Sequence, residues 1–203
     1  MTIRHGEPWG EPGGLDADGI VVESDRAARR LIESALDDGR PLPAIGLVGG
    51  DLCRTVGGPG DRSRIFGDGM RLPVDLGMVS LDGGPEQPFV AHCFFLRSWL
   101  IGPITAVMNA QFRGTWDVAP RSHPNDGRLD VLQCSLGLSD RIKARRRLAL
   151  GSHVPHPGIV EQRVRNIVLE FRRPQTVLID GERMGRCRSA ALHIVPDAYT
   201  VVV

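Results

Sequence analysis

From about residue 89 onward, the chain is a succession of short runs of β-branched and aromatic residues, each bounded by turn-forming residues. The runs are residues 89–96, 104–112, 116–119, 129–135, 167–171, 176–179, 191–195 and 199–203. Such runs favour β-strands, and many of them in a row favour a sandwich or an open barrel. One helix, predicted over residues 139–150, interrupts them. Two Asp-Gly pairs, Asp126-Gly127 and Asp180-Gly181, predict hairpin turns, because glycine adopts the positive φ that these turns need.

Residues 1–72 follow a different pattern and predict a small α/β unit. Over residues 25–36 the apolar residues recur at helical spacing, behind an N-cap at Ser24 or Asp25. The same spacing places Arg29 among the charged residues on the outer face of this helix.

A strand–turn–helix pattern follows this helix. Residues 43–48 predict a short buried strand, which leads through Gly49, Gly50 and Asp51 into a further helical turn at residues 52–56. The expected fold class is therefore α+β and mainly β.

Charge and composition exclude several function classes. The 203 residues include 25 basic and 24 acidic side chains, a formal net charge of +1, and 41% hydrophobic residues. A near-neutral chain lacks the basic footprint of a general nucleic-acid binder, and its length suits one domain with at most a small appendage. Lys143 is the single lysine and does not follow a glycine-rich turn, so a P-loop and a Schiff-base mechanism are ruled out.

Cysteine usage and hydropathy indicate the compartment. The four cysteines are far apart and form no C-x-x-C pair, which favours small buried side chains over a zinc or redox site. The N-terminal residues do not resemble a signal peptide, and the longest uncharged run, residues 98–112, is too short to span a bilayer. We expect a cytoplasmic protein, at most peripherally associated with membrane.

Two carboxylate-bearing turns are the candidate functional sites. In the segment 116–131, the Asn-Asp-Gly turn can present the Asp126 carboxylate and backbone carbonyls to a hard cation such as Mg²⁺. The alternative is a hairpin whose aspartate bonds to its own backbone. In the segment 177–182, Asp180 and Glu182 follow a strand, and one of them can act as a general base; a plain hairpin is again the alternative.

Taken together and in order, the segments 104–112, 116–131, 151–158 and 179–182 resemble the C-terminal domain of bacterial diacylglycerol-kinase-like lipid kinases. That superfamily also contains sphingosine kinases and NAD kinases. The resemblance implies a β-sandwich domain over residues 73–203, packed on a truncated α/β remnant of a nucleotide-binding domain over residues 1–72.

The resemblance also implies roles for particular residues. A Mg²⁺ is expected at the Asp126 carboxylate and at the main-chain carbonyls of His123 and Arg128. The general base that takes the proton of the lipid hydroxyl corresponds to Glu182, with Asp180 beside it.

The N-terminal part departs from the family pattern. Gly49, Gly50 and Asp51 are similar to the start of the family's phosphate loop and are the candidate nucleotide-binding residues. Leu52 and Cys53 replace the glycine and threonine of that loop. The βαβ units that normally precede the loop are also missing from the pattern.

Three interpretations stay open at this point. The first is an ATP- and Mg²⁺-dependent kinase that transfers phosphoryl to a lipid hydroxyl. The second is a catalytically inactive homologue that binds a lipid, a nucleotide or a protein partner. The third is a fragment whose other half lies on a separate chain or upstream of Met1. A homodimer is compatible with each, and nucleic acid is not an expected partner.

Overall fold

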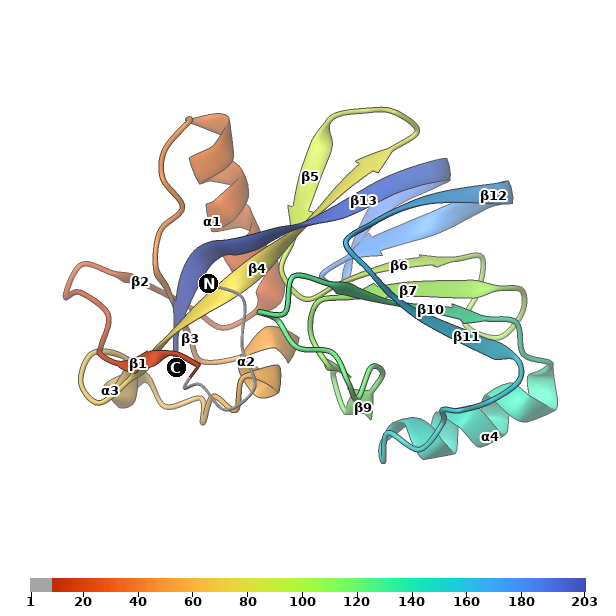
Figure 1. Cartoon of the computed structure of the whole chain (residues 1–203), viewed down its shortest axis with the longest axis horizontal. Coiled ribbons are helices and arrows are strands. Elements are labelled where there is room, and N and C mark those ends of the chain that lie inside the picture. The colour runs from red at the N-terminus through yellow and green to blue at the C-terminus, as the bar shows by residue number, and fades with distance from the viewer. Residues whose placement is uncertain (1–8) are drawn as a thin grey trace.

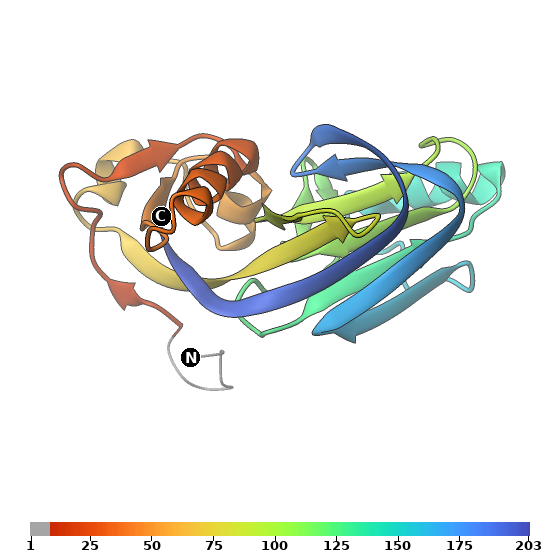
Figure 2. The ribbon, with the colours of Figure 1, turned by 90° about the horizontal axis from the view of Figure 1, so that it is seen from above.

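Two long strands, β4 (Met70–Leu81) and β13 (Glu182–Val202), form the backbone of the fold. The computed structural model describes residues 9–203. β4 and β13 pair antiparallel from Leu81 with Ala190 to Arg71 with Val202, with a register shift between Val195 and Tyr199. They run along the molecule from the helix α1 side to the β-rich side (Figures 1 and 2).

Six further strands extend this pair into one sheet in the order β1-β4-β13-β12-β6-β7-β10-β11, in which neighbouring strands are antiparallel. Their bounds are β1 Glu11–Pro12, β6 His92–Leu96, β7 Ile104–Met108, β10 Leu129–Cys134, β11 Ile159–Val164 and β12 Asn166–Ile179. The strand β5 (Glu86–Phe89) pairs with β4. Buried side chains from β4, β6, β10 and β13 share one core cluster, so the sheet folds over its own apolar face. The mainly β, sandwich-type α+β fold is confirmed.

The structure corrects several predicted strands. The runs 167–171 and 176–179 belong to the single strand β12, and the last two runs belong to β13. β4 and β11 were not predicted. Long strands were divided in the prediction because polar residues interrupt the apolar runs where the backbone pairing continues or shifts register.

The two predicted hairpin turns differ in outcome. Asp180 (φ 46°) and Gly181 (φ 80°) join β12 to β13 as a tight hairpin, as predicted. Asp126-Gly127 is not a hairpin turn, because β9 (Trp116–Asp117) pairs with β8 (Phe112–Arg113), whereas β10 pairs with β7 and β11. The loop is held instead by Asp75 of β4, whose carboxylate accepts from the Gly127 amide at 2.7 Å.

The N-terminal part adds two parallel strands and three helices. β2 (Ile20–Val22) pairs with β3 (Ile45–Leu47), and β3 pairs with β13, so this part continues the same sheet. The helices are α1 (Asp25–Asp37), α2 (Asp51–Thr55) and α3 (Arg62–Ile65). The proposed boundary between residues 72 and 73 falls inside β4, and the division into two domains stays a prediction.

Helix α1 starts where the sequence predicted, with the Ser24 side chain accepting from the Ala27 amide. Ala28 and Ile32 are buried on its inner face. Arg29, expected on the outer face, is only 2% exposed. The prediction failed because carboxylates from outside the helix lie against Arg29, and helical spacing carries no information about them.

Helix α4 (Leu138–Leu148) confirms the predicted helix and lies at the end of the molecule opposite α1 and the C-terminus (Figure 1). None of its eleven residues, all of them described, is buried. Within residues 9–203, no helix has the length and apolar character needed to cross a membrane.

Candidate functional site

A polar pocket of about 270 Å³ lies where α2 begins, next to the start of β6 and the β12–β13 turn. Its lining residues are Asp51, His92, Arg113, Gly114, Asp180 and Gly181. The structure thus brings together Asp51, predicted to bind nucleotide, and Asp180, predicted beside the base. His92 and Arg113 were not predicted, because neither lies in a motif.

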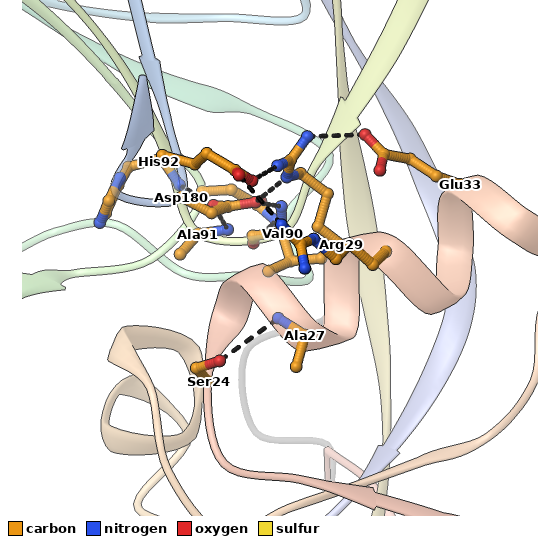
Figure 3. A network of polar contacts seen from close by, with 11 residues as sticks. Ser24, Ala27, Arg29, Glu33, Val90, Ala91, His92 and Asp180 are labelled. Atoms are coloured by element: carbon orange, nitrogen blue, oxygen red, sulfur yellow. Dashed lines mark hydrogen bonds and ion pairs between the residues drawn. The ribbon is translucent and has the colours of Figure 1, made fainter. Parts of the chain in front are cut away.

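Asp180 is fully buried and acts as a clamp on the chain that enters β6. Its carboxylate accepts hydrogen bonds from the backbone amides of Val90 (2.9 Å), Ala91 (2.9 Å) and His92 (3.0 Å) (Figure 3). Burial raises the pKa of Asp180, although the charge of His92 and these three amides act to lower it. With its oxygens committed to the backbone, this carboxylate fixes the floor of the pocket.

His92 and Asp51 form a polar pair across the pocket. His92 Nε2 lies 2.9 Å from Asp51 Oδ2, and Asp51 Oδ1 accepts from the Gly114 amide at 2.6 Å. The other ring nitrogen, Nδ1, is buried and has no hydrogen-bond partner among the described residues. The pair therefore links α2 to the strand end that Asp180 holds.

The start of α2, where the sequence suggested a phosphate loop, is occupied by a carboxylate of the chain itself. Asp25 accepts from the backbone amides of Asp51 (2.6 Å) and Leu52 (3.0 Å). Gly50 has φ 99°, and a Cβ there would lie 2.5 Å from Asp25 Oδ1, so the close approach requires glycine. Burial, followed by the charge of Asp180, raises the pKa of Asp25 to about 6. The assignment of Gly49, Gly50 and Asp51 to nucleotide binding stays a prediction.

Glu182, the predicted general base, is bound by two arginines of α1. Its carboxylate pairs with the Arg29 guanidinium and accepts from Arg30 Nη2 at 3.0 Å. Arg29 also pairs with Glu33 at 2.6 Å (Figure 3) and lies 3.9 Å from Asp180. The pKa of Glu182 is lowered, because the hydrogen bond and charge of Arg30, with the charge of Arg29, outweigh the opposing effect of burial.

None of the predicted metal ligands, His123, Asp126 and Arg128, lines this pocket. Asp126 pairs with Arg163, whose Nε also lies 3.2 Å from Asp130. Asp126 Oδ1 is buried and has no hydrogen-bond partner within residues 9–203, and burial raises the pKa of Asp126 to about 6. A buried carboxylate oxygen that lacks a donor fits a hard cation. The set of Asp126 with the His123 and Arg128 main-chain carbonyls stays a prediction.

An apolar cleft, which sequence reasoning missed, lies between the sheet and α4. The cavity measures about 180 Å³. The side chains that line it include Phe94, Ile104, Leu132, Leu136, Ile142 and Leu148. Because α4 covers the sheet without burying any of its own residues, the space between them stays open.

Arg113 lies between the polar pocket and three aromatic rings of the apolar cleft. It lines the polar pocket, and its guanidinium carbon lies 4.4 Å from the ring centroid of Trp99, 5.1 Å from that of Phe94 and 5.7 Å from that of Trp116. All three rings line the apolar cleft. Burial lowers the pKa of Arg113, and the charge of Asp51 opposes this effect. The polar pocket and the apolar cleft are therefore adjacent, with the Arg113 side chain between them.

Comparisons with known proteins identify the fold. One solved structure that carries the name diacylglycerol kinase, from Bacillus anthracis, superposes with a TM-score of 0.64 at 14% identity, covering 91% of this chain and 77% of that chain. A second from the same organism gives a TM-score of 0.59 at 14% identity, covering 79% and 69%. Among curated proteins, none matches the sequence.

The family model described as the YegS C-terminal NAD kinase beta sandwich-like domain matches residues 97–203, which is just over half of the chain. The resemblance to diacylglycerol-kinase-like proteins is thereby confirmed. This chain belongs to the YegS C-terminal NAD kinase beta sandwich-like family and has the fold of diacylglycerol-kinase-like proteins.

Proposed function

We propose that this protein binds a lipid that has a hydroxyl-bearing headgroup. An acyl chain occupies the apolar cleft, and the headgroup reaches the polar pocket. The observation that carries the proposal is the position of Arg113, which packs on three rings of the cleft and lines the pocket. A ligand that fills both cavities must have an apolar part and a polar part joined at this residue.

The physical chemistry of the two cavities matches such a ligand. Burying acyl methylenes in the cleft contributes about 0.8 kcal/mol each. In the pocket, the Asp51 carboxylate accepts a hydrogen bond from a hydroxyl, and Arg113 donates to an ester or hydroxyl oxygen. Both side chains already lie at the pocket wall, so binding requires little ordering of the protein.

Phosphoryl transfer is a second candidate, favoured by the intact Asp180-Gly181-Glu182 turn. In that reaction the lipid oxygen forms a bond to the γ-phosphorus of ATP, the bond from that phosphorus to ADP breaks, and Glu182 takes the hydroxyl proton. The Mg²⁺ expected for such a kinase would be held by Asp126 and the main-chain carbonyls of His123 and Arg128.

Two observations favour binding without transfer. The amides at the start of α2 already have the Asp25 carboxylate as their acceptor, so they are not available to a phosphate. Glu182 is bonded to two arginines that lower its pKa, and a carboxylate in that state is a weak proton acceptor. Lipid binding without phosphoryl transfer, as in an inactive homologue, is therefore the function that the geometry supports best.

Filling the cleft tests lipid binding. Ala106 is buried on β7 and lines the cavity, so a larger side chain in Ala106→Phe occupies space that an acyl chain needs. We expect the affinity for a fluorescent diacylglycerol to fall roughly tenfold, as the loss of two buried methylenes predicts. The control is Val168→Phe at an exposed position of β12. Equal affinity in Ala106→Phe and wild type, with thermal unfolding unchanged, would overturn the proposal.

Calorimetry with Mg²⁺-ATP and a radiolabelled transfer assay separate the two candidates. Binding without transfer predicts no heat of ATP binding at millimolar nucleotide and no labelled lipid. Lipid phosphorylation by the wild type that is lost in Glu182→Gln would establish the kinase in its place.

A further inference from the structure

The loop between β6 and β7 exposes three large apolar side chains in a row. Trp99 is 39% exposed, Leu100 62% and Ile101 61%. On the neighbouring helix α4, Leu138 is 58% exposed and Ile142 52%. Exposed apolar side chains that gather in this way mark an interaction surface.

Helix α4 is also strongly basic. Five of its eleven residues are basic and one is acidic, although the whole chain has a net charge of only +1. The basic residues are Arg141, Lys143, Arg145, Arg146 and Arg147. The last four of these are exposed.

Arg141 joins the loop and the helix into one surface. Its side chain donates to the backbone carbonyls of Trp99 at 3.3 Å, of Gly102, and of Leu136 at 3.0 Å. We call the loop residues 99–101 and helix α4 together the docking surface. It lies at the end of the molecule opposite α1 (Figure 1).

We propose that the docking surface binds an anionic membrane. Its apolar side chains enter the boundary between headgroups and acyl chains, and its basic side chains contact lipid phosphates. The clustered positive charge favours an anionic bilayer over a second copy of the same surface, which would bring like charges together. Apolar side chains beside the charges favour a lipid surface over nucleic acid.

Docking on a membrane also explains how a lipid reaches the apolar cleft. This part of the inference rests on the proposed function. Trp99, Leu100, Leu138 and Ile142 line the apolar cleft as well as forming part of the docking surface. When this surface lies on a bilayer, an acyl chain passes into the cleft without crossing water.

Co-sedimentation with vesicles tests the proposal. We expect binding to phosphatidylcholine vesicles that contain phosphatidylglycerol, weaker binding in high salt, and little binding to phosphatidylcholine alone. The triple variant Lys143→Gln, Arg146→Gln, Arg147→Gln should lose roughly 100-fold in affinity, since each basic side chain at an anionic surface contributes about fivefold. The matched control removes three exposed charges in and next to β12, through Arg165→Gln, Arg172→Gln and Arg173→Gln.

A second pair of variants tests the apolar contact. Leu100→Ser with Ile101→Ser should weaken vesicle binding at least tenfold, whereas Val168→Ser at an exposed site on β12 should not. Equal binding to neutral and anionic vesicles, or equal loss in the charge control, would overturn the proposal. Self-association in ultracentrifugation that Leu100→Ser with Ile101→Ser abolishes, without vesicle binding by the wild type, would also overturn it in favour of a dimer interface.

The cleft variant distinguishes this proposal from the function it extends. Ala106→Phe should keep vesicle binding while it loses diacylglycerol binding. If wild-type protein binds vesicles but no diacylglycerol, the docking surface stands and the proposed function fails. If it binds diacylglycerol in detergent micelles but no anionic vesicles, the reverse holds.

Discussion

Two arginine-rich helices lie at opposite ends of this molecule and use their charges in opposite ways. In α1, Arg29 and Arg30 pair with carboxylates, and Arg29 is buried among Glu33, Asp180 and Glu182. In α4, most of the basic side chains face solvent. Arginine content alone therefore does not predict whether a helix is held to its own protein or is available to a partner.

The difference follows from what each helix packs against. Arg29 lies next to Ala28 and three residues before Ile32, both buried, so the packing of these apolar residues draws Arg29 into the interior. A buried guanidinium requires carboxylate partners, and Glu182 supplies one from the far end of the chain. Helix α4 makes no such contact, because it covers an open cleft.

Removing the buried arginine should have the largest effect. Arg29→Met leaves the carboxylates of Asp180 and Glu182 without their closest positive charge, and breaking a buried pair in this way costs about 3–5 kcal/mol. We expect a matching drop in the free energy of unfolding, measured by urea denaturation.

The matched control is Arg30→Met, one position along the same helix. The side chain of Arg30 is 62% exposed and shares the Glu182 partner, so its loss should cost less than about 1 kcal/mol. Equal losses in the two variants would show that the burial of Arg29 does not determine its role.

The pH dependence of stability should report the charge at the start of α2. The pKa of Asp25 is about 6 in the folded protein, against 3.8 for an ordinary aspartate. The folded state holds the proton more tightly, so the contribution of this group to stability is full below pH 3.8 and is lost as the pH rises through about 6. Asp25→Asn does not titrate.

The free energy of unfolding of Asp25→Asn, relative to wild type, should therefore rise by about 2 kcal/mol between about pH 4.5 and about pH 7.5. The amide side chain of Asp25→Asn can form one hydrogen bond fewer than the Asp25 carboxylate, but this loss is the same at every pH. The change of the difference with pH therefore still reports the titration of Asp25. A difference that stays constant across this range would mean that Asp25 is ionised throughout.

The ion pair of Asp126 with Arg163 allows a test of whether Arg163 and Mg²⁺ compete for the Asp126 carboxylate. At a Mg²⁺ concentration ten times the Kd, the free energy of unfolding of the wild type should rise by about 1.4 kcal/mol, seen as a higher unfolding temperature. Asp126→Asn should remove this effect. Arg163→Met should strengthen it, because Arg163 places a competing charge on the same carboxylate. The control is Asp16→Asn at an exposed position. An identical Mg²⁺ response in Asp126→Asn and Asp16→Asn would mean that Asp126 does not bind Mg²⁺.

Local patterns predicted much of the fold and less of the site. The helices starting at Ser24 and near Leu138, and the Asp180-Gly181 turn, follow from caps, spacing and glycine chemistry within a few residues. The 21-residue strand β13 was divided in the prediction, because its continuity depends on pairing with β4 and β12. The pairing with β4 joins residues more than a hundred positions apart and leaves no local signal.

The candidate site shows the same limit. Asp51, Asp180 and Glu182 could be found because they lie in short motifs that resemble a family. His92, Arg113 and Arg29 could not, since their roles come from carboxylates and rings brought together by the sheet. A buried arginine in a polar helix has the same sequence pattern as a solvated one.

Helix α4 gives the smallest expected effect on stability and completes the contrast with α1. Lys143→Gln, Arg146→Gln and Arg147→Gln together should change the free energy of unfolding by less than about 1 kcal/mol, the size of a helix-dipole contribution in the last turn. The same triple variant is the one expected to lose vesicle binding. A loss of stability as large as that of Arg29→Met would mean that these charges hold α4 to the sheet, and the contrast between the two helices would fail.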